Sequence, residues 1–512
     1  MLPSAALAAA GGILFSIPFL PLLPEAAGTA LAFLGFFLFC LSVSRASSPK
    51  VGAMSGLLFG LFSFTPGLSW VYQSLHVYGG LPAILGIAAL LLLAFANSLF
   101  CSAAAALSTL ERTEAVRTAL VFPALFTLFD WLRGSALCSF PWVSIGYLQS
   151  GTPFGGIVPI LGTYGAGLAA SVAAGSAAAA VLHGLAPKAR GAAAASAAFV
   201  TLLCALAGFA GWTEPGRTVP VRLVQPGLPL AGLTGIEPLT EEERIRRTAA
   251  VTGKIQDQRL VIWPESVVNT SIQRLTPPAV RALADAFPGP GSSLVLNSFW
   301  EPHPLEFRNS LFLIRPGMES ERYDKRHLVP FGEYVPPGFH WFVAALGIPM
   351  SDQTPGKYLQ KPFTIPVYGL TAAPMICYEN AFGDELRAFW STAPAGQPPS
   401  LLVVSSNLAW FSESVQHQHL LFSRLRAKET ALPLVSVNNN GSSAVITPDG
   451  AVESRLGTVP GVLDAEVVTR TGGPTPFVRF GNLPAAVLAL LLALLPARAV
   501  RRKKQKTDKH LK

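Results

Sequence analysis

Long apolar stretches, separated by short polar loops, dominate the first two fifths of the chain. A helix of about 17–25 apolar residues can cross a bilayer. Stretches long enough to do so occur at 5–24, 26–44, 51–74, 81–108, 117–133, 156–184 and 191–212. An eighth runs from 480 to 497. The pattern predicts about eight transmembrane helices. No Lys or Arg precedes the first stretch, which indicates a retained helix rather than a cleaved signal peptide.

Residues 218–472 follow a different pattern, in which short apolar runs alternate with polar segments. Runs rich in Val, Ile and Leu and bounded by turn residues predict strands at 221–225, 260–263, 293–297, 311–314, 374–377, 401–405, 434–437 and 444–447. Helical patterns fall near 239–256, 277–287 and 415–430. This mixture predicts an α/β domain in which helices cover sheets, long enough to bury its own core.

We therefore expect three parts along the chain. Residues 1–217 form a seven-helix transmembrane region, 218–472 a folded domain outside the membrane, and 473–512 a last transmembrane helix with a basic tail. The composition supports residence in a membrane, because 51% of the residues are hydrophobic and only 13% are charged. A soluble protein averages about 25% charged residues.

The basic residues predict an orientation. The net charge is +9, and the tail 498–512 holds most of the excess. Nucleic-acid binding is one interpretation of such a tail, but short loops between the spans are basic too. They contain Arg45, Lys50, Arg112, Arg117, Lys188 and Arg190. After eight crossings these loops and the tail share one side, which the positive-inside rule makes the cytoplasm. We expect a bacterial inner-membrane protein with a cytoplasmic C-terminus, a periplasmic 218–472 domain and no nucleic-acid partner.

Cys377 is the one cysteine of five that lies in the polar domain rather than in or beside an apolar stretch. A thiol attacks a carbonyl only as thiolate, and its pKa of about 8.5 calls for a base or a nearby cation. Glu265, at the end of the predicted strand 260–263, can supply the base. Lys325 can stabilise both the thiolate and the oxyanion of a tetrahedral intermediate, with the backbone N–H of Tyr378 as a second donor. Taken singly, such residues are more often packing or surface groups.

Together these groups resemble the Glu-Lys-Cys set of the nitrilase superfamily, and the surrounding motifs resemble its membrane-bound branch, the apolipoprotein N-acyltransferases. The motifs are Trp263-Pro264-Glu265-Ser266, Lys325 with His327-Leu328-Val329-Pro330-Phe331-Gly332-Glu333, Ile376-Cys377-Tyr378-Glu379, Asn407-Leu408-Ala409-Trp410-Phe411 and, in the membrane region, Asp130-Trp131-Leu132-Arg133-Gly134. The resemblance covers nearly the whole chain. It implies an α-β-β-α sandwich for residues 218–472.

The resemblance also implies a two-step reaction. Cys377 would take an acyl chain from a phospholipid such as phosphatidylethanolamine, forming a thioester. The α-amine of a diacylglyceryl-modified cysteine at the N-terminus of an apolipoprotein would then receive it. Glu265 would act as base and Lys325 would hold the oxyanion, with no metal or cofactor. The implied supporting or substrate-binding residues are Glu333, which orients Lys325 or the base, Tyr378 and Glu379, which shape the pocket, and Arg133, Asn407 and Trp410.

Some apolar and charged residues predict contacts with lipid. Arg133 lies near the external end of the fifth stretch, where an arginine is costly unless it is paired or at the interface. We expect it to meet a lipid phosphate or a carboxylate. The segments 73–78 and 139–142 would line a path for lipid. Phe339, Trp341 and Phe342 would form a mobile apolar lid.

Three alternatives remain open at the level of sequence. A membrane-tethered amidase or hydrolase would use the same three groups and release the acyl chain to water. A transporter or receptor would need several ionisable residues within the spans, and we find mainly Asp130 and Arg133. An inactive scaffold is disfavoured by the complete set. Departures from the family pattern, such as Leu408 where Asp is common and Asp130 where Glu is usual, affect the preferred lipid rather than the three groups.

Overall fold

The computed structural model describes residues 2–136, 139–230, 238–287, 289, 291–304, 306–315, 317–338, 340–341 and 352–495. Two of the predicted lid residues, Phe339 and Phe342, lie outside these ranges, as does the basic tail. The chain divides into two compact units. The first comprises Met1–His76, Leu81–Ala210 and Phe480–Lys512, and the second comprises Val77–Gly80 and Gly211–Arg479.

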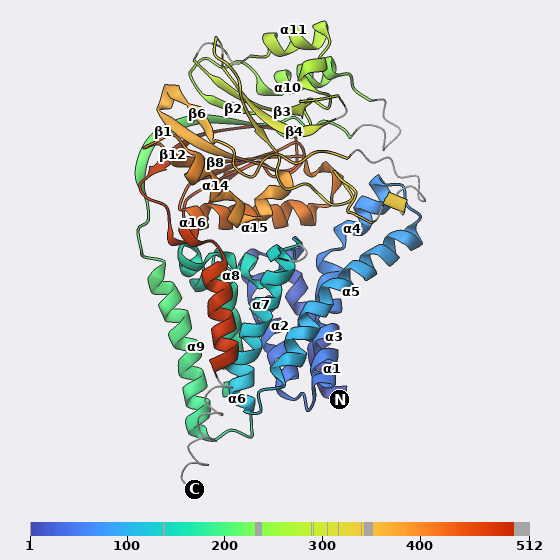
Figure 1. The fold of residues 1–512 in the computed structure, drawn as a ribbon, viewed down its shortest axis with the longest axis vertical. Helices are drawn as coiled ribbons and strands as arrows, with labels where there is room; N and C mark the ends of the chain where they lie inside the picture. Colours follow the sequence, from blue (N-terminus) through green and yellow to red (C-terminus); the bar gives the residue numbers. More distant parts are fainter. Residues whose placement is uncertain are drawn as a thin grey trace. The chain divides into compact units, whose positions relative to one another are not determined.

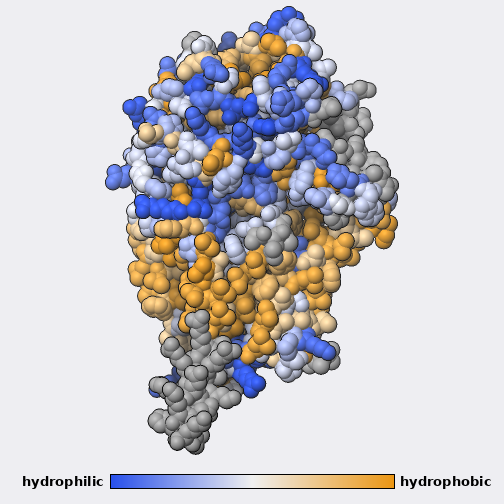
Figure 2. Space-filling view, in the orientation of Figure 1, coloured by the Kyte–Doolittle hydropathy of each residue, from blue (hydrophilic) through white to orange (hydrophobic). Residues whose placement is uncertain are grey.

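The first unit is helical, and its described surface is mostly apolar in Figure 2. Its helices are α1 (Leu2–Ser16), α2 (Glu25–Ser44), α3 (Pro49–Gly67), α4 (Trp70–Gln73), α5 (Ala83–Ser108), α6 (Glu114–Val116), α7 (Phe122–Trp131), α8 (Val158–Ala180) and α9 (Pro187–Ala207). Within the described ranges, five helices are long and apolar enough to span a membrane, or six if one bent pair counts as a single span. Shorter apolar helices occupy Ser4–Phe19 and Leu483–Leu495. The predicted total of eight spans stays a prediction.

The third apolar stretch, predicted at 51–74, forms two helices rather than one continuous helix. It bends by 49° between Pro49–Gly67 and Trp70–Tyr78. Pro66 lies in the last turn of α3, where it cannot donate a backbone hydrogen bond. The backbone continues as a π-helix over Ser74–Tyr78, another common cause of a kink. A hydropathy pattern alone predicts neither the effect of Pro66 nor the π-helix.

Glycines spaced four residues apart bring α3 and α5 into close contact. A Cβ atom added at Gly56 would lie 2.3 Å from the backbone oxygen of Cys101, and one at Gly60 would lie 2.6 Å from Ser98. Small residues at this spacing allow helix backbones to approach closely where lipid provides no hydrophobic driving force between helices. The same spacing at Gly52 continues the contact along α3.

The second unit is a sandwich of two six-stranded sheets. The first sheet has the order β12-β1-β2-β3-β4-β5 and the second the order β11-β10-β9-β8-β7-β6. The strands are β1 (Glu214–Gln225), β2 (Leu260–Ile262), β3 (Ser293–Trp300), β4 (Arg308–Ile314), β5 (Glu321–Asp324), β6 (Phe363–Ile365), β7 (Leu370–Ile376), β8 (Pro399–Ser406), β9 (Leu434–Asn438), β10 (Ala444–Ile446), β11 (Val452–Arg455) and β12 (Gly461–Thr471). All eight predicted strands are present, and the predicted fold class is confirmed.

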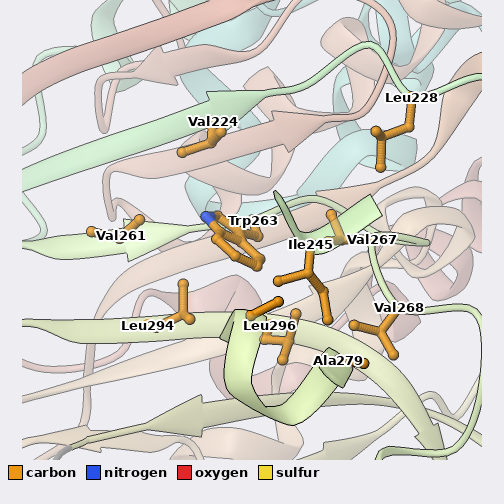
Figure 3. Packing of buried hydrophobic residues seen from close by; sticks show 11 residues of the cluster. Val224, Leu228, Ile245, Val261, Trp263, Val267, Val268, Ala279, Leu294 and Leu296 are labelled. Carbon is orange, nitrogen blue, oxygen red and sulfur yellow. The ribbon is translucent and has the colours of Figure 1, made fainter. Parts of the chain in front are cut away.

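Helices cover both outer faces of the sandwich. α10 (Glu241–Thr252) and α11 (Pro277–Asp285) lie on one face, and α14 (Ala388–Thr392) and α15 (Glu413–Thr430) lie on the other (Figure 1). Two further α-helices among the described residues of this unit are α13 (Gly383–Leu386) and α16 (Pro476–Phe480). Under α10 and α11, the indole of Trp263 packs among aliphatic side chains from β1, β2 and β3 (Figure 3). This core fixes the end of β2, three residues before Glu265.

Candidate active site

Four of the predicted site residues meet inside the second unit. The Lys325 Nζ atom lies 2.8 Å from Glu333 Oε1 and 3.7 Å from Glu265 Oε1. The thiol of Cys377 hydrogen-bonds with Glu265. The side chain of Lys325 is only 1% exposed, and Cys377 is 7% exposed. The cluster therefore places a thiol, a base and a cation together in a site largely shielded from water.

Strand ends bring these groups together. β2 ends three residues before Glu265, β5 ends just before Lys325, and β7 ends at Ile376, next to Cys377. Cys377 itself has a φ of 50°, a left-handed conformation that is unfavourable for any residue with a Cβ atom. Strain of this kind persists only where surrounding contacts enforce it, and it concentrates at functional sites.

Burial and charge set the protonation of the thiol and the amine. Burial raises the pKa of Cys377 well above its ordinary value, and the negative charge of Glu265 raises it further, while Lys325 opposes the change. Burial alone would lower the pKa of Lys325, but the carboxylates of Glu333 and Glu265 outweigh it and raise that pKa. The resting site thus holds a neutral thiol beside a charged ammonium. The thiol must lose its proton to a base as it attacks.

This arrangement predicts how alkylation of Cys377 depends on pH. Iodoacetamide reacts with the thiolate, so labelling should rise only above the ordinary thiol pKa of about 8.5. Glu265→Gln removes a negative charge that disfavours the thiolate, and should lower the apparent pKa of labelling. Lys325→Met removes the favourable cation and should raise it. Mass spectrometry of the Cys377 peptide across the pH series measures both shifts, and shifts of equal sign would contradict the arrangement.

Asn309, which sequence reasoning missed, connects the two glutamates of the site. Its Nδ2 atom donates to Glu265 Oε1 at 2.8 Å and to Glu333 Oε1 at 3.2 Å. Its Oδ1 atom accepts a hydrogen bond from Asn297 Nδ2 at 2.7 Å, which fixes the orientation of the amide. Asn is depleted in strands. The asparagines in the segments that form β3 and β4 were therefore the signal in the sequence that could have indicated a polar contact at this place.

Glu379 is buried beside the turn that carries Cys377 and does not lie in an open pocket. It is 1% exposed and accepts hydrogen bonds from Tyr323 Oη at 2.8 Å and from the backbone N–H of Arg326 at 2.6 Å. It also accepts from the backbone N–H of Ile376 at 2.8 Å. Burial raises the pKa of Glu379, against the opposing effect of Arg326. Glu379 therefore ties the segment after Lys325 to the turn that carries Cys377.

Tyr378, Asn407 and Trp410, three further predicted site residues, differ in their surroundings. The ring of Tyr378 meets Phe382 edge-on, with centroids 5.0 Å apart. The backbone N–H of Asn407 donates to Glu265 Oε2 at 3.0 Å, so this residue holds the Glu265 carboxylate directly. Trp410, three residues later, is 40% exposed. Trp341 of the predicted lid is exposed as well, at 70%.

Arg133 belongs to the first unit and is paired there with a carboxylate. Its Nη2 atom lies 2.6 Å from Asp130 Oδ1, and its guanidinium also donates to the backbone oxygens of Phe140 and Trp142. Arg133 is 2% exposed. Of the two partners that we expected for it, the structure contains the carboxylate. Arg133 therefore fixes the backbone of the 139–142 segment.

Across the ranges that the structure describes, no group of three or more His, Cys, Asp or Glu side chains is arranged to hold a metal ion. The chemistry of the cluster rests on a nucleophile, a base and a cation. These are the parts needed for covalent acyl transfer.

Two protein families match separate parts of the chain. Residues 11–176 match the apolipoprotein N-acyltransferase N-terminal domain, and residues 245–476 match the carbon-nitrogen hydrolase family. An apolipoprotein N-acyltransferase from Ralstonia nicotianae is 37% identical over 459 residues, covering 86% of this chain and 84% of its own. The corresponding protein of Bordetella bronchiseptica is 35% identical over 503 residues, covering 90% of each chain.

Solved structures of an amidase and of a carbon-nitrogen hydrolase are each similar to about half of this chain. An amidase from Nesterenkonia is 18% identical and covers 54% of this chain and 97% of its own, with a TM-score of 0.33. A carbon-nitrogen hydrolase from Helicobacter pylori is 17% identical and covers 49% of this chain and 89% of its own, with a TM-score of 0.35.

Proposed function

Because the chain belongs to the apolipoprotein N-acyltransferase family, we propose that it moves an acyl chain from a phospholipid to a lipoprotein. The donor is a glycerophospholipid, with phosphatidylethanolamine as our specific expectation. The acceptor is the α-amine of an N-terminal diacylglyceryl-cysteine. A thioester on Cys377 connects the two half-reactions.

The observation that carries this proposal is the buried cluster of Glu265, Lys325 and Cys377. The thiol hydrogen-bonds with the base, and the ammonium lies 3.7 Å from the same carboxylate. Because the pKa of the thiol is raised, a preformed thiolate is not the nucleophile. Glu265 instead removes the proton during attack, which is general base catalysis by a group already in hydrogen-bond contact.

In the first half-reaction the sulfur of Cys377 attacks the ester carbonyl carbon while its proton passes to Glu265. The carbonyl oxygen becomes an oxyanion, which Lys325 and the backbone N–H of Tyr378 stabilise. The C–O bond to glycerol then breaks, and the leaving alkoxide takes the proton from Glu265. The products are a thioester enzyme and a lysophospholipid.

In the second half-reaction the neutral acceptor amine attacks the thioester carbonyl. Glu265 accepts the proton of the amine, the C–S bond breaks, and the sulfur recovers that proton. Lys325 stabilises the second oxyanion as it did the first. Glu333, 2.8 Å from Lys325 Nζ, holds the ammonium in place through both steps.

Exposed aromatic residues close in sequence to the site support lipid substrates over water-soluble amides. Phe331 is 44% exposed and lies two residues before Glu333, while Trp410 is 40% exposed and lies three residues after Asn407. In this proposal they contribute to a contiguous apolar patch, the kind of surface that marks a site for binding lipid or protein. A hydrolase that passes the acyl chain to water remains the second candidate, because the same three groups would serve it.

The basic loops supply the proposed location. From the positive-inside rule we expect Arg45, Lys50, Lys188 and Arg190 in the cytoplasm, and therefore the sandwich domain in the periplasm. Lipoprotein acceptors and phospholipid donors are both anchored in the inner membrane in this proposal, so a multi-pass protein meets both without releasing either.

Mass spectrometry of the full-length protein in phosphatidylethanolamine micelles tests the proposal. We expect a hydroxylamine-labile acyl adduct on the Cys377 peptide. A synthetic diacylated lipopeptide should discharge that adduct and become triacylated. Discharge at the same rate without lipopeptide would identify the hydrolase, and an unmodified thiol would overturn both candidates.

A further inference from the structure

Arg244 is a buried cation of the sandwich domain that the reaction described above does not use. It lies in α10, 3% exposed, and burial lowers the pKa of its guanidinium despite the charge of Glu241. Its hydrogen-bond partners are backbone oxygens. The Nε atom donates to Val267 O at 3.1 Å, and the Nη2 atom donates to Ser266 O. Both carbonyls belong to the two residues that follow Glu265.

The turn held by Arg244 is strained. Ser266 has a φ of 65°, in the left-handed region that is unfavourable for residues other than glycine. Its backbone N–H donates to Asn297 Oδ1 at 2.9 Å. Asn297 and Arg244 thus hold the Ser266 backbone at its N–H and at its carbonyl. The strained turn persists because both sides are fixed.

A second contact joins α10 to the same loop. Glu241 Oε2, in the first turn of α10, accepts a hydrogen bond from the backbone N–H of Asn269 at 3.0 Å. The start of the helix is itself fixed, because Thr240 and Glu243 form a capping box. One residue beyond Arg244, Ile245 packs in the apolar cluster with Val267, beside Trp263 (Figure 3).

From these contacts we infer that Arg244 is a positioning residue for the proposed base, Glu265. Asn309 and the backbone of Asn407 orient the carboxylate of Glu265. The position of the Glu265 Cα atom depends on the turn that follows this residue. Arg244 fixes that turn. This inference rests on the proposed function, since it assigns Arg244 an effect on the acylation step. A misplacement of about 1 Å at a catalytic group can cost about 100-fold in rate.

Single-turnover acylation of the full-length protein tests the inference. Phosphatidylethanolamine with a labelled acyl chain is supplied in detergent micelles, and the labelled thioester at Cys377 is followed with time. Arg244→Met, which keeps the length but removes every donor, should slow acylation about 10- to 100-fold without changing the concentration of donor at half-maximal rate. Arg244→Lys, which can still donate to one carbonyl, should recover part of the rate.

Two controls separate positioning from loss of stability. Arg246→Met changes an exposed arginine of the same helix and should acylate at the wild-type rate. Val219→Ala creates a cavity in β1, where the side chain is fully buried, and lowers stability without touching the turn. If Val219→Ala slows acylation as much as Arg244→Met at an equal loss of thermal stability, Arg244 is only structural and the inference is wrong.

Acylation of the wild-type protein distinguishes a failure of the proposed function from a failure of the positioning role of Arg244. Absence of a thioester on the wild-type protein would overturn the proposed function. A wild-type thioester together with wild-type acylation rates in Arg244→Met would overturn the positioning role alone.

Discussion

Cys377→Ala should lower the rate of transfer of phospholipid acyl chains by a factor of at least about 10⁴, while leaving the protein folded. Loss of the nucleophile of a covalent mechanism removes the intermediate itself, and comparable losses in other triads reach about 10⁶. The substitution removes a single heavy atom from this buried position, so the cavity that it leaves and its effect on stability are small. The measurement is the yield of triacylated lipopeptide from phosphatidylethanolamine and a diacylated lipopeptide.

Cys377→Ser provides a second variant for the same experiment, since it keeps the size and a polar atom. A serine hydroxyl is far harder to deprotonate than a thiol, so the oxygen ester should form at a small fraction of the wild-type rate. The matched control is Cys204→Ala, in a buried position of α9, which should retain full transfer. Continued triacylation by Cys377→Ala would place the acyl carrier elsewhere and end the proposed mechanism.

The sandwich could be predicted from the sequence because its central strands are continuous apolar runs. β2, β8 and β9 are buried along their whole length, and such runs are typical of parallel strands covered on both faces. Three of the four strands that sequence reasoning missed, β5, β11 and β12, carry exposed and charged residues, and the fourth, β6, is only three residues long. In β11 exposed and half-buried positions alternate over Val452–Arg455, so a hydrophobic pattern of that length does not distinguish it from a loop.

The candidate site was only partly predictable, for a different reason. Glu265, Lys325 and Cys377 each lie in a local motif, and the three motifs taken together made them candidates. Asn309 donates to Glu265, which is 44 residues away along the chain. Arg244 donates to Ser266, which is 22 residues away. No local pattern records which carboxylate or carbonyl such a side chain will meet. The contacts that orient a catalytic group are therefore the part of the site that can be identified only from the three-dimensional structure.

Lys325→Met should reduce both catalysis and stability, which makes it more informative than loss of the nucleophile. Removing one oxyanion donor typically slows acyl transfer by about 10²–10³. The same change leaves Glu265 and Glu333 without the cation between them, and breaking a buried ion pair in this way costs about 3–5 kcal/mol. Thermal unfolding in detergent and single-turnover acylation measure the two effects separately. Lys357→Met, at an exposed position, is the control for loss of a lysine charge.

The double variant Lys325→Met with Glu333→Gln separates the two roles of the lysine. Replacing Glu333 by its neutral amide removes one of the two carboxylates that the cation balances, so part of the lost stability should return. The acylation rate should stay low, because neither substitution restores a donor for the oxyanion. Recovery of acylation along with stability would mean that Lys325 serves the fold and not the transition state. Low acylation in a stable double variant would leave oxyanion stabilisation as the role of Lys325, because charge balance at the site no longer depends on it.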